Sequence, residues 1–136
     1  MSPPSSHIFW VNNDKRNINN LDELLSWIEF LKNEAKSKGM PFSVQLQKEE
    51  NSSLLFTVGL TICHLEFYSA HSSPIVTGCR GSWENGDEII TFWHGDEPSE
   101  MEKKYFVPFE EALQGIKEYF LTGERPKNIQ WGDNNI

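Results

Sequence analysis

The chain has 136 residues, of which 38% are apolar, and a formal net charge of −8. That length predicts a single domain over residues 1–136 whose core needs neither a metal nor a disulfide, with a flexible start at residues 1–7. No apolar run approaches the roughly 20 residues that a membrane-spanning helix requires, and the N-terminus lacks the basic and apolar regions of a signal peptide. We therefore expect a cytoplasmic protein that does not contact a membrane.

The net charge is concentrated in one segment of the chain. Residues 81–124 contain eleven acidic and three basic residues, whereas residues 1–80 contain eight acidic and seven basic residues. Nucleic acid requires a surface of the opposite sign, so this segment argues against direct nucleic-acid binding and favours a basic protein as partner. The alternative interpretation is an acidic surface that only keeps the protein soluble.

A helix is predicted over residues 21–38, where the helical periodicity is clearest. Asn19 or Asn20 is a suitable N-cap, and Gly39 followed by Pro41 ends the pattern. The apolar stripe of this helix consists of Leu21, Leu24, Leu25, Ile28, Leu31 and Ala35.

Apolar stretches separated by short polar segments predict several strands. In some of these stretches apolar and polar residues alternate. The strands are expected at residues 8–11, 42–47, 54–60, 62–68, 75–77 and 89–93. Residues 12–20 and the acidic residues 94–100 are expected to be loops. The strand at 62–68 is expected to carry Cys63, Leu65 and Phe67 on one face and His64, Glu66 and Tyr68 on the other. The short connections predict an antiparallel meander of five or six strands.

A second helix is predicted with Pro108 in its first turn, where the missing N–H of proline has no partner anyway, and with its end at Gly123, after which Pro126 prevents continuation. Its apolar stripe consists of Phe109, Ala112, Leu113, Ile116 and Phe120. A short extended piece is expected at 128–131. Both helices are expected to cover one face of the meander, so the predicted fold class is α+β.

The order of residues in this C-terminal stretch resembles the signature of a family of bacterial immunity proteins. These proteins accompany polymorphic toxins, especially toxins with nucleic-acid deaminase domains. The matching positions are Pro108, Glu111, Ala112, Phe120, Thr122, Gly123, Arg125, Pro126 and Trp131. The resemblance, which covers about a sixth of the chain, implies a non-catalytic protein that binds the C-terminal domain of a cognate toxin and occludes its active site. It implies structural roles for the signature residues Pro108, Ala112, Phe120, Gly123, Arg125, Pro126 and Trp131.

Tryptophans and acidic residues occur together between residues 83 and 100. Exposed aromatic residues rimmed by charge are effective anchors in protein interfaces. The expected partner-binding residues are therefore Trp83, Glu84, Asp87, Glu88, Trp93, Asp96, Glu97 and Glu100. The alternative is that both tryptophans belong to the core and the acidic residues are only solvated. An acidic adaptor that binds some other basic protein, without any link to a toxin, remains the alternative function.

No catalytic motif is present in the sequence. It has neither the phosphate-cradling glycine pattern of nucleotide-binding proteins nor the motif of a zinc deaminase, and we expect no cofactor and no metal site. Acid–base chemistry by His64 with Glu66, or by His94 with Asp96, keeps a small hydrolase open as an alternative. The two cysteines, Cys63 and Cys79, are expected to be buried apolar residues without a disulfide.

Overall fold

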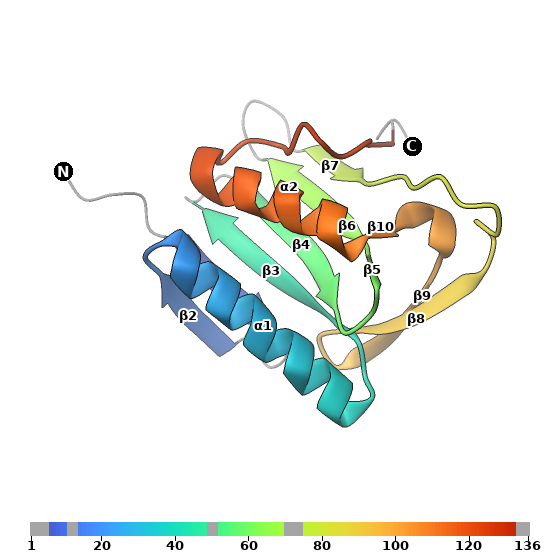
Figure 1. Cartoon of the computed structure of the whole chain (residues 1–136), viewed down its shortest axis with the longest axis horizontal. Helices are drawn as coiled ribbons and strands as arrows, with labels where there is room; N and C mark the ends of the chain where they lie inside the picture. The colour runs from blue at the N-terminus through green and yellow to red at the C-terminus, as the bar shows by residue number, and fades with distance from the viewer. Residues whose placement is uncertain (1–5, 11–13, 49–51, 70–74, 133–136) are drawn as a thin grey trace.

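A twisted β-sheet and two helices make up the fold, so the predicted α+β class is confirmed (Figure 1). The computed structural model describes residues 6–10, 14–48, 52–69 and 75–132. Neither described helix is long and apolar enough to cross a membrane.

The main sheet has eight strands, six of which lie in the order β2-β1-β3-β4-β6-β7. These strands are β1 (Ser6–Trp10), β2 (Asp14–Ile18), β3 (Phe42–Lys48), β4 (Ser52–Val58), β6 (Leu65–Ser69) and β7 (Ile75–Gly78). The other two, β8 (Ile89–His94) and β9 (Glu97–Glu102), form a hairpin that joins the sheet where Trp93 pairs in parallel with Phe42. A separate antiparallel pair consists of β5 (Ile62–Cys63) and β10 (Val107–Pro108).

Both helices end where the sequence predicts; the first also begins there, whereas the second begins one residue later, with Pro108 as the N-cap and not in the first turn. In α1 (Leu21–Lys38) the Asn20 side chain accepts a hydrogen bond from the Glu23 amide at 2.9 Å, and Gly39 ends the helix in the left-handed conformation at φ 62°. In α2 (Phe109–Thr122) Pro108 is the N-cap and Gly123 ends the helix at φ 75°. Glycine adopts this conformation without the steric cost that a side chain imposes.

One hydrophobic core joins the helices to the sheet, and in Figure 1 both helices run in front of the strands. The strand registers align the core residues of β3, β4 and β6 on one face, because Leu46 lies opposite Leu54 and Val44 opposite Phe56. Helix α1 contributes Leu24, Ile28, Leu31 and Ala35, and α2 contributes Phe109, Ala112, Ile116, Tyr119 and Phe120. Leu113, predicted as part of the α2 stripe, is only half-buried, and Tyr119, which the stripe omits, is fully buried.

Two predicted loops are wrong in part because polar strands carry no apolar alternation. Residues 14–18 form β2, which pairs with β1, and residues 97–100 belong to β9, which pairs with β8. Backbone hydrogen bonds to the neighbouring strand hold such a polar edge strand in place without an apolar face. Residues 12 and 13 of the first predicted loop lie outside the described part of the chain.

Other boundaries differ by a few residues. Ser6 and His7 belong to β1 rather than to a flexible start, while residues 1–5 lie outside the described ranges. The strand predicted at 62–68 is interrupted at His64, which lies between β5 and β6. The extended piece expected at 128–131 is reduced to a single bridge between Trp131 and Cys79.

Candidate functional site

The acidic residues predicted to bind a partner lie on the β8–β9 hairpin and the turn before it. In Figure 1 the hairpin lies to the right of both helices. The register separates its residues into two faces, with Glu100 opposite Thr91 on one face and Glu97 opposite His94 on the other. Asp96 lies in the tight turn between the two strands.

A hollow of about 580 Å³ opens at the turn before β8, lined by Glu84, Asn85, Asp87 and Glu88. Three of these four lining residues are carboxylates. Lys103 lies 3.8 Å from Glu88, and this partly exposed pair offsets one of the charges. The hollow therefore keeps a negative potential that suits a cationic group.

Trp83 and Trp93, the two predicted aromatic anchors, both have structural contacts. The indole nitrogen of Trp83 donates a hydrogen bond to the carbonyl oxygen of Phe106 at 2.8 Å, and the Lys103 ammonium lies 4.4 Å from its ring centre. Trp93 is half-buried against the core, and its amide donates to the Pro41 carbonyl at 2.8 Å. Both residues tie the hairpin region to the domain, and their contact with a partner stays a prediction.

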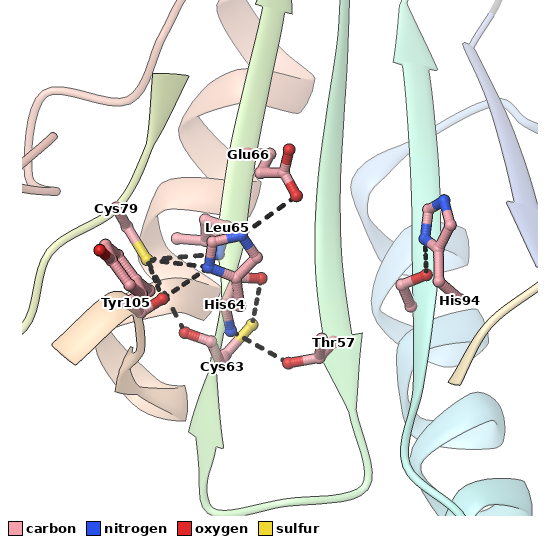
Figure 2. A network of polar contacts seen from close by, with 9 residues as sticks. Thr57, Cys63, His64, Leu65, Glu66, Cys79, His94 and Tyr105 are labelled. Atoms are coloured by element: carbon pink, nitrogen blue, oxygen red, sulfur yellow. Dashed lines mark hydrogen bonds and ion pairs between the residues drawn. The ribbon is translucent and has the colours of Figure 1, made fainter. Parts of the chain in front are cut away.

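A second polar cluster surrounds His64, and Figure 2 shows its ring between Glu66 and Tyr105, with Cys79 beside it. His64 Nε2 lies 3.1 Å from a carboxylate oxygen of Glu66, and Nδ1 lies against the carbonyl oxygen of Tyr105. The Cys79 thiol donates to the same carbonyl oxygen at 3.1 Å, and the Thr57 hydroxyl accepts from the His64 amide at 3.0 Å. The cluster joins four segments of the chain.

The geometry of this cluster favours the protonated imidazolium, because each ring nitrogen faces an acceptor. Burial acts to lower the pKa of His64, but its contacts with Cys79, Glu66 and the Tyr105 carbonyl raise it to about 10. The hydrogen bond from His64 lowers the pKa of Glu66. Burial raises the pKa of the Cys63 thiol to about 12, and Cys63 and Cys79 are both free thiols.

These contacts bear on the hydrolase alternative. An imidazolium that donates from both nitrogens has no lone pair with which to act as a base, and His64 is only 5% exposed. His94 Nδ1 lies 2.8 Å from the Ser43 hydroxyl, and among the described residues His94 and Asp96 form no hydrogen bond or ion pair with each other. The His64 cluster therefore serves to hold segments together, and the part of the chain that is described contains no group of three or more metal-binding side chains.

The raised pKa of His64 predicts a pH-dependent stability. Because the folded-state pKa of about 10 lies above the ordinary value of 6.5, the stabilisation is fully present below the ordinary value and is lost as the pH rises towards the folded one. We expect the unfolding free energy of the wild type to fall by up to about 1.4 kcal/mol per pH unit within that window relative to His64→Gln. Denaturant unfolding of both proteins from about pH 6 to about pH 9 measures this difference.

His94→Gln is the control, because His94 is exposed and affects the cluster through its charge near Glu66 rather than through a hydrogen bond to His64. This variant should keep the wild-type pH slope. Parallel curves for the wild type and His64→Gln would contradict an imidazolium at position 64.

The signature residues run from the N-cap of α2, Pro108, along the helix and into the segment after it. The Trp131 indole donates to the Pro126 carbonyl at 2.8 Å, and the Arg125 guanidinium lies 5.6 Å from the Trp131 ring centre. Ala112, Phe120 and Pro126 are buried. A Cβ at Gly115, which the signature omits, would lie 3.1–3.2 Å from side-chain atoms of residues 126, 128 and 129, so this helix position permits their close approach.

The sequence did not predict that Ile89 is exposed. The sequence predicts Ile89 in a strand, where a β-branched residue usually packs against its neighbours. In the structure the exposed fraction of Ile89 is 54%. The signal available in the sequence is the flanking pattern, because acidic residues precede it at positions 87 and 88.

A small α+β domain that presents an acidic hairpin with an exposed apolar residue has the construction of a protein-binding module. The chain matches, over residues 12–133, the family model described as Immunity protein Imm1, and it therefore belongs to the Imm1 immunity protein family. This membership gives the chain a toxin-neutralising immunity role exercised on a cognate toxin. No curated protein matches the chain.

Proposed function

We propose that the protein neutralises a cognate toxin domain that modifies nucleic acid, specifically a deaminase, by covering its active site in the cytoplasm. The resemblance of the segment from Pro108 to Trp131 to the signature of deaminase-associated immunity proteins supports this class of toxin. We propose that this action is by binding alone, and the buried His64 ring, with both nitrogens engaged, is not available as a base.

The observation that carries the proposal is the placement of negative charge. Residues 81–124 contain eleven acidic and three basic residues, and the acidic ones before residue 103 lie on the hairpin and the turn before it. An enzyme that acts on nucleic acid needs a basic cleft for the phosphates of its substrate. An acidic hairpin is complementary to such a cleft and competes directly with the substrate.

Co-expression with the toxin domain encoded beside its gene tests this proposal. We expect restored growth, a complex that co-purifies, and deamination of single-stranded nucleic acid that falls as the immunity protein is added up to one equivalent. Binding should weaken at high salt because opposite charges are screened. A neutralised toxin without deaminase activity would correct the toxin class, and a complex that leaves the deaminase active would overturn occlusion.

A further inference from the structure

The β8–β9 hairpin packs on the domain mainly through the face of Ile90 and Phe92, while Trp93, at the far end of the opposite face, is half-buried against the core. On the packed face Ile90 pairs with Met101 and Phe92 pairs with Ser99. Phe92 is 5% exposed and packs edge-on against Phe106, with ring centres 6.2 Å apart. Neighbouring side chains along each strand point to the other face.

That other face is open to solvent between Ile89 and Thr91. Ile89 lies opposite Glu102, and Thr91 lies opposite Glu100. Thr91 and Glu100 are exposed, and Ile89 is 54% exposed. Fully burying an isoleucine side chain is worth roughly 1.5–3 kcal/mol. Because Ile89 is only partly buried in the free protein, a partner that covers it gains much of that stabilisation.

The acidic hollow lies at the start of β8. Glu88, which lines the hollow, immediately precedes Ile89 in the chain. The hollow therefore lies at the end of the hairpin that carries the exposed apolar residue. The carboxylates of Glu84 and Asp87 also line the hollow, and its volume of about 580 Å³ admits a long cationic side chain. Guanidinium and ammonium groups form strong, charge-assisted hydrogen bonds with carboxylates.

We propose that this open face and the hollow together form the surface on which a basic protein domain docks. We call it the hairpin docking face and define it by the hollow residues with Ile89, Thr91, Glu100 and Glu102. Ile89 is the apolar anchor, and an arginine or lysine of the partner occupies the hollow. The inference rests on the proposed function, which identifies the partner as the cognate toxin domain.

The arrangement of the hairpin docking face matches how protein interfaces distribute their affinity. A few buried apolar or aromatic contacts near the centre dominate the binding energy, and a polar rim surrounds them. Ile89 supplies the centre, while the carboxylates at positions 88, 100 and 102 supply the rim, where Glu88 lies 3.8 Å from Lys103 and Glu102 lies 3.4 Å from Lys104. The rim charges accelerate association with a basic partner and orient it.

The affinity of full-length variants for the toxin domain tests the hairpin docking face. We expect Ile89→Arg to raise Kd by about 30-fold or more, because it removes the apolar contact and brings a like charge towards the basic partner. Glu100→Lys should raise Kd about tenfold at low salt, mainly through slower association, and less at high salt. Surface plasmon resonance at two salt concentrations measures the association and dissociation rates separately.

Two variants on α2 and directly after it provide matched controls. Leu121→Arg makes a similar apolar-to-cation change at an exposed position, since Leu121 is 62% exposed. Glu124→Lys makes the same charge change as Glu100→Lys at an exposed position beyond the end of α2. Each control should change Kd by less than about threefold, because neither side chain lies on the hairpin.

The failure of this inference is distinguishable from the failure of the proposed function. If the wild type neutralises the toxin and the hairpin variants bind as tightly as the controls, the docking face is elsewhere and the immunity function stands. If the wild type does not bind the toxin, both the docking face and the proposed function are overturned.

Hydrogen exchange of the wild-type complex gives a measurement without variants, and protection should appear at residues 84–91 and 100–102. Protection confined to other segments would overturn the hairpin docking face.

Discussion

Replacing Tyr119 with alanine is expected to lower the unfolding free energy by about 4 kcal/mol or more. Tyr119 is fully buried, and its ring packs edge-on against Phe67 with centres 6.1 Å apart. Its hydroxyl lies 2.9 Å from the Ser52 hydroxyl and accepts a hydrogen bond from the Lys48 amide at 3.1 Å. The substitution therefore opens a cavity and also removes partners of buried polar groups at the ends of β3 and β4.

Tyr119→Phe separates these two contributions, because it keeps the ring and removes only the hydroxyl. We expect it to cost about 1–3 kcal/mol. Leu121→Ala on the same helix is exposed and should change stability by less than about 0.5 kcal/mol. Denaturant unfolding of the three variants gives the comparison. A loss for Tyr119→Phe no larger than for Leu121→Ala would contradict the buried hydrogen bonds.

Periodic elements were predictable from the sequence because local signals specify them. The helix α1 combines an apolar stripe with a cap at Asn20 and a left-handed end at Gly39, and each signal acts within a few residues. The alternation that begins at Phe42 likewise predicts β3, since its buried and half-buried positions alternate. Only the exact ends of such elements depend on their neighbours in space.

Elements that depend on distant partners were not predictable. β2 and β9 are polar edge strands that hydrogen bonds to β1 and β8 stabilise, and nothing local separates them from loops. The break at His64 similarly depends on Tyr105 and Cys79, which lie 41 and 15 residues away in the chain.

The candidate site was predictable as a segment but not as a surface. Charge counting identifies the acidic residues from position 84 to position 100. Only the register shows that Glu100 and Glu97 lie on opposite faces of the hairpin. Likewise Ile89 has the pattern of a core residue, yet it is 54% exposed, because only the Trp93 end of that hairpin face reaches the core. Whether these residues contact the toxin stays a prediction.

Replacing Gly81 with alanine is expected to lower the unfolding free energy by about 3 kcal/mol. A Cβ at this position would overlap the carbonyl oxygen of Phe106 and the indole nitrogen of Trp83. Those two atoms form the hydrogen bond that ties Trp83 to the segment after β9, and the Gly81 amide donates to the Lys104 carbonyl at 2.8 Å. Phe106 is fully buried, so its backbone has little room to shift. The added methyl group therefore forces apart two segments and weakens their hydrogen bonds.

Gly39→Ala is the matched control, because it adds the same methyl group where no atom lies within 4 Å but the backbone has φ 62°. It should cost only about 1–2 kcal/mol, the conformational penalty of the left-handed region. Denaturant unfolding of both variants measures the difference, and equal losses would contradict the close approach at Gly81. Since the contacts of Gly81 and Trp83 connect the segments before and after the hairpin, Gly81→Ala should also weaken toxin binding under conditions where Gly39→Ala does not. The position thereby links the stability of the domain to the geometry of the hairpin docking face.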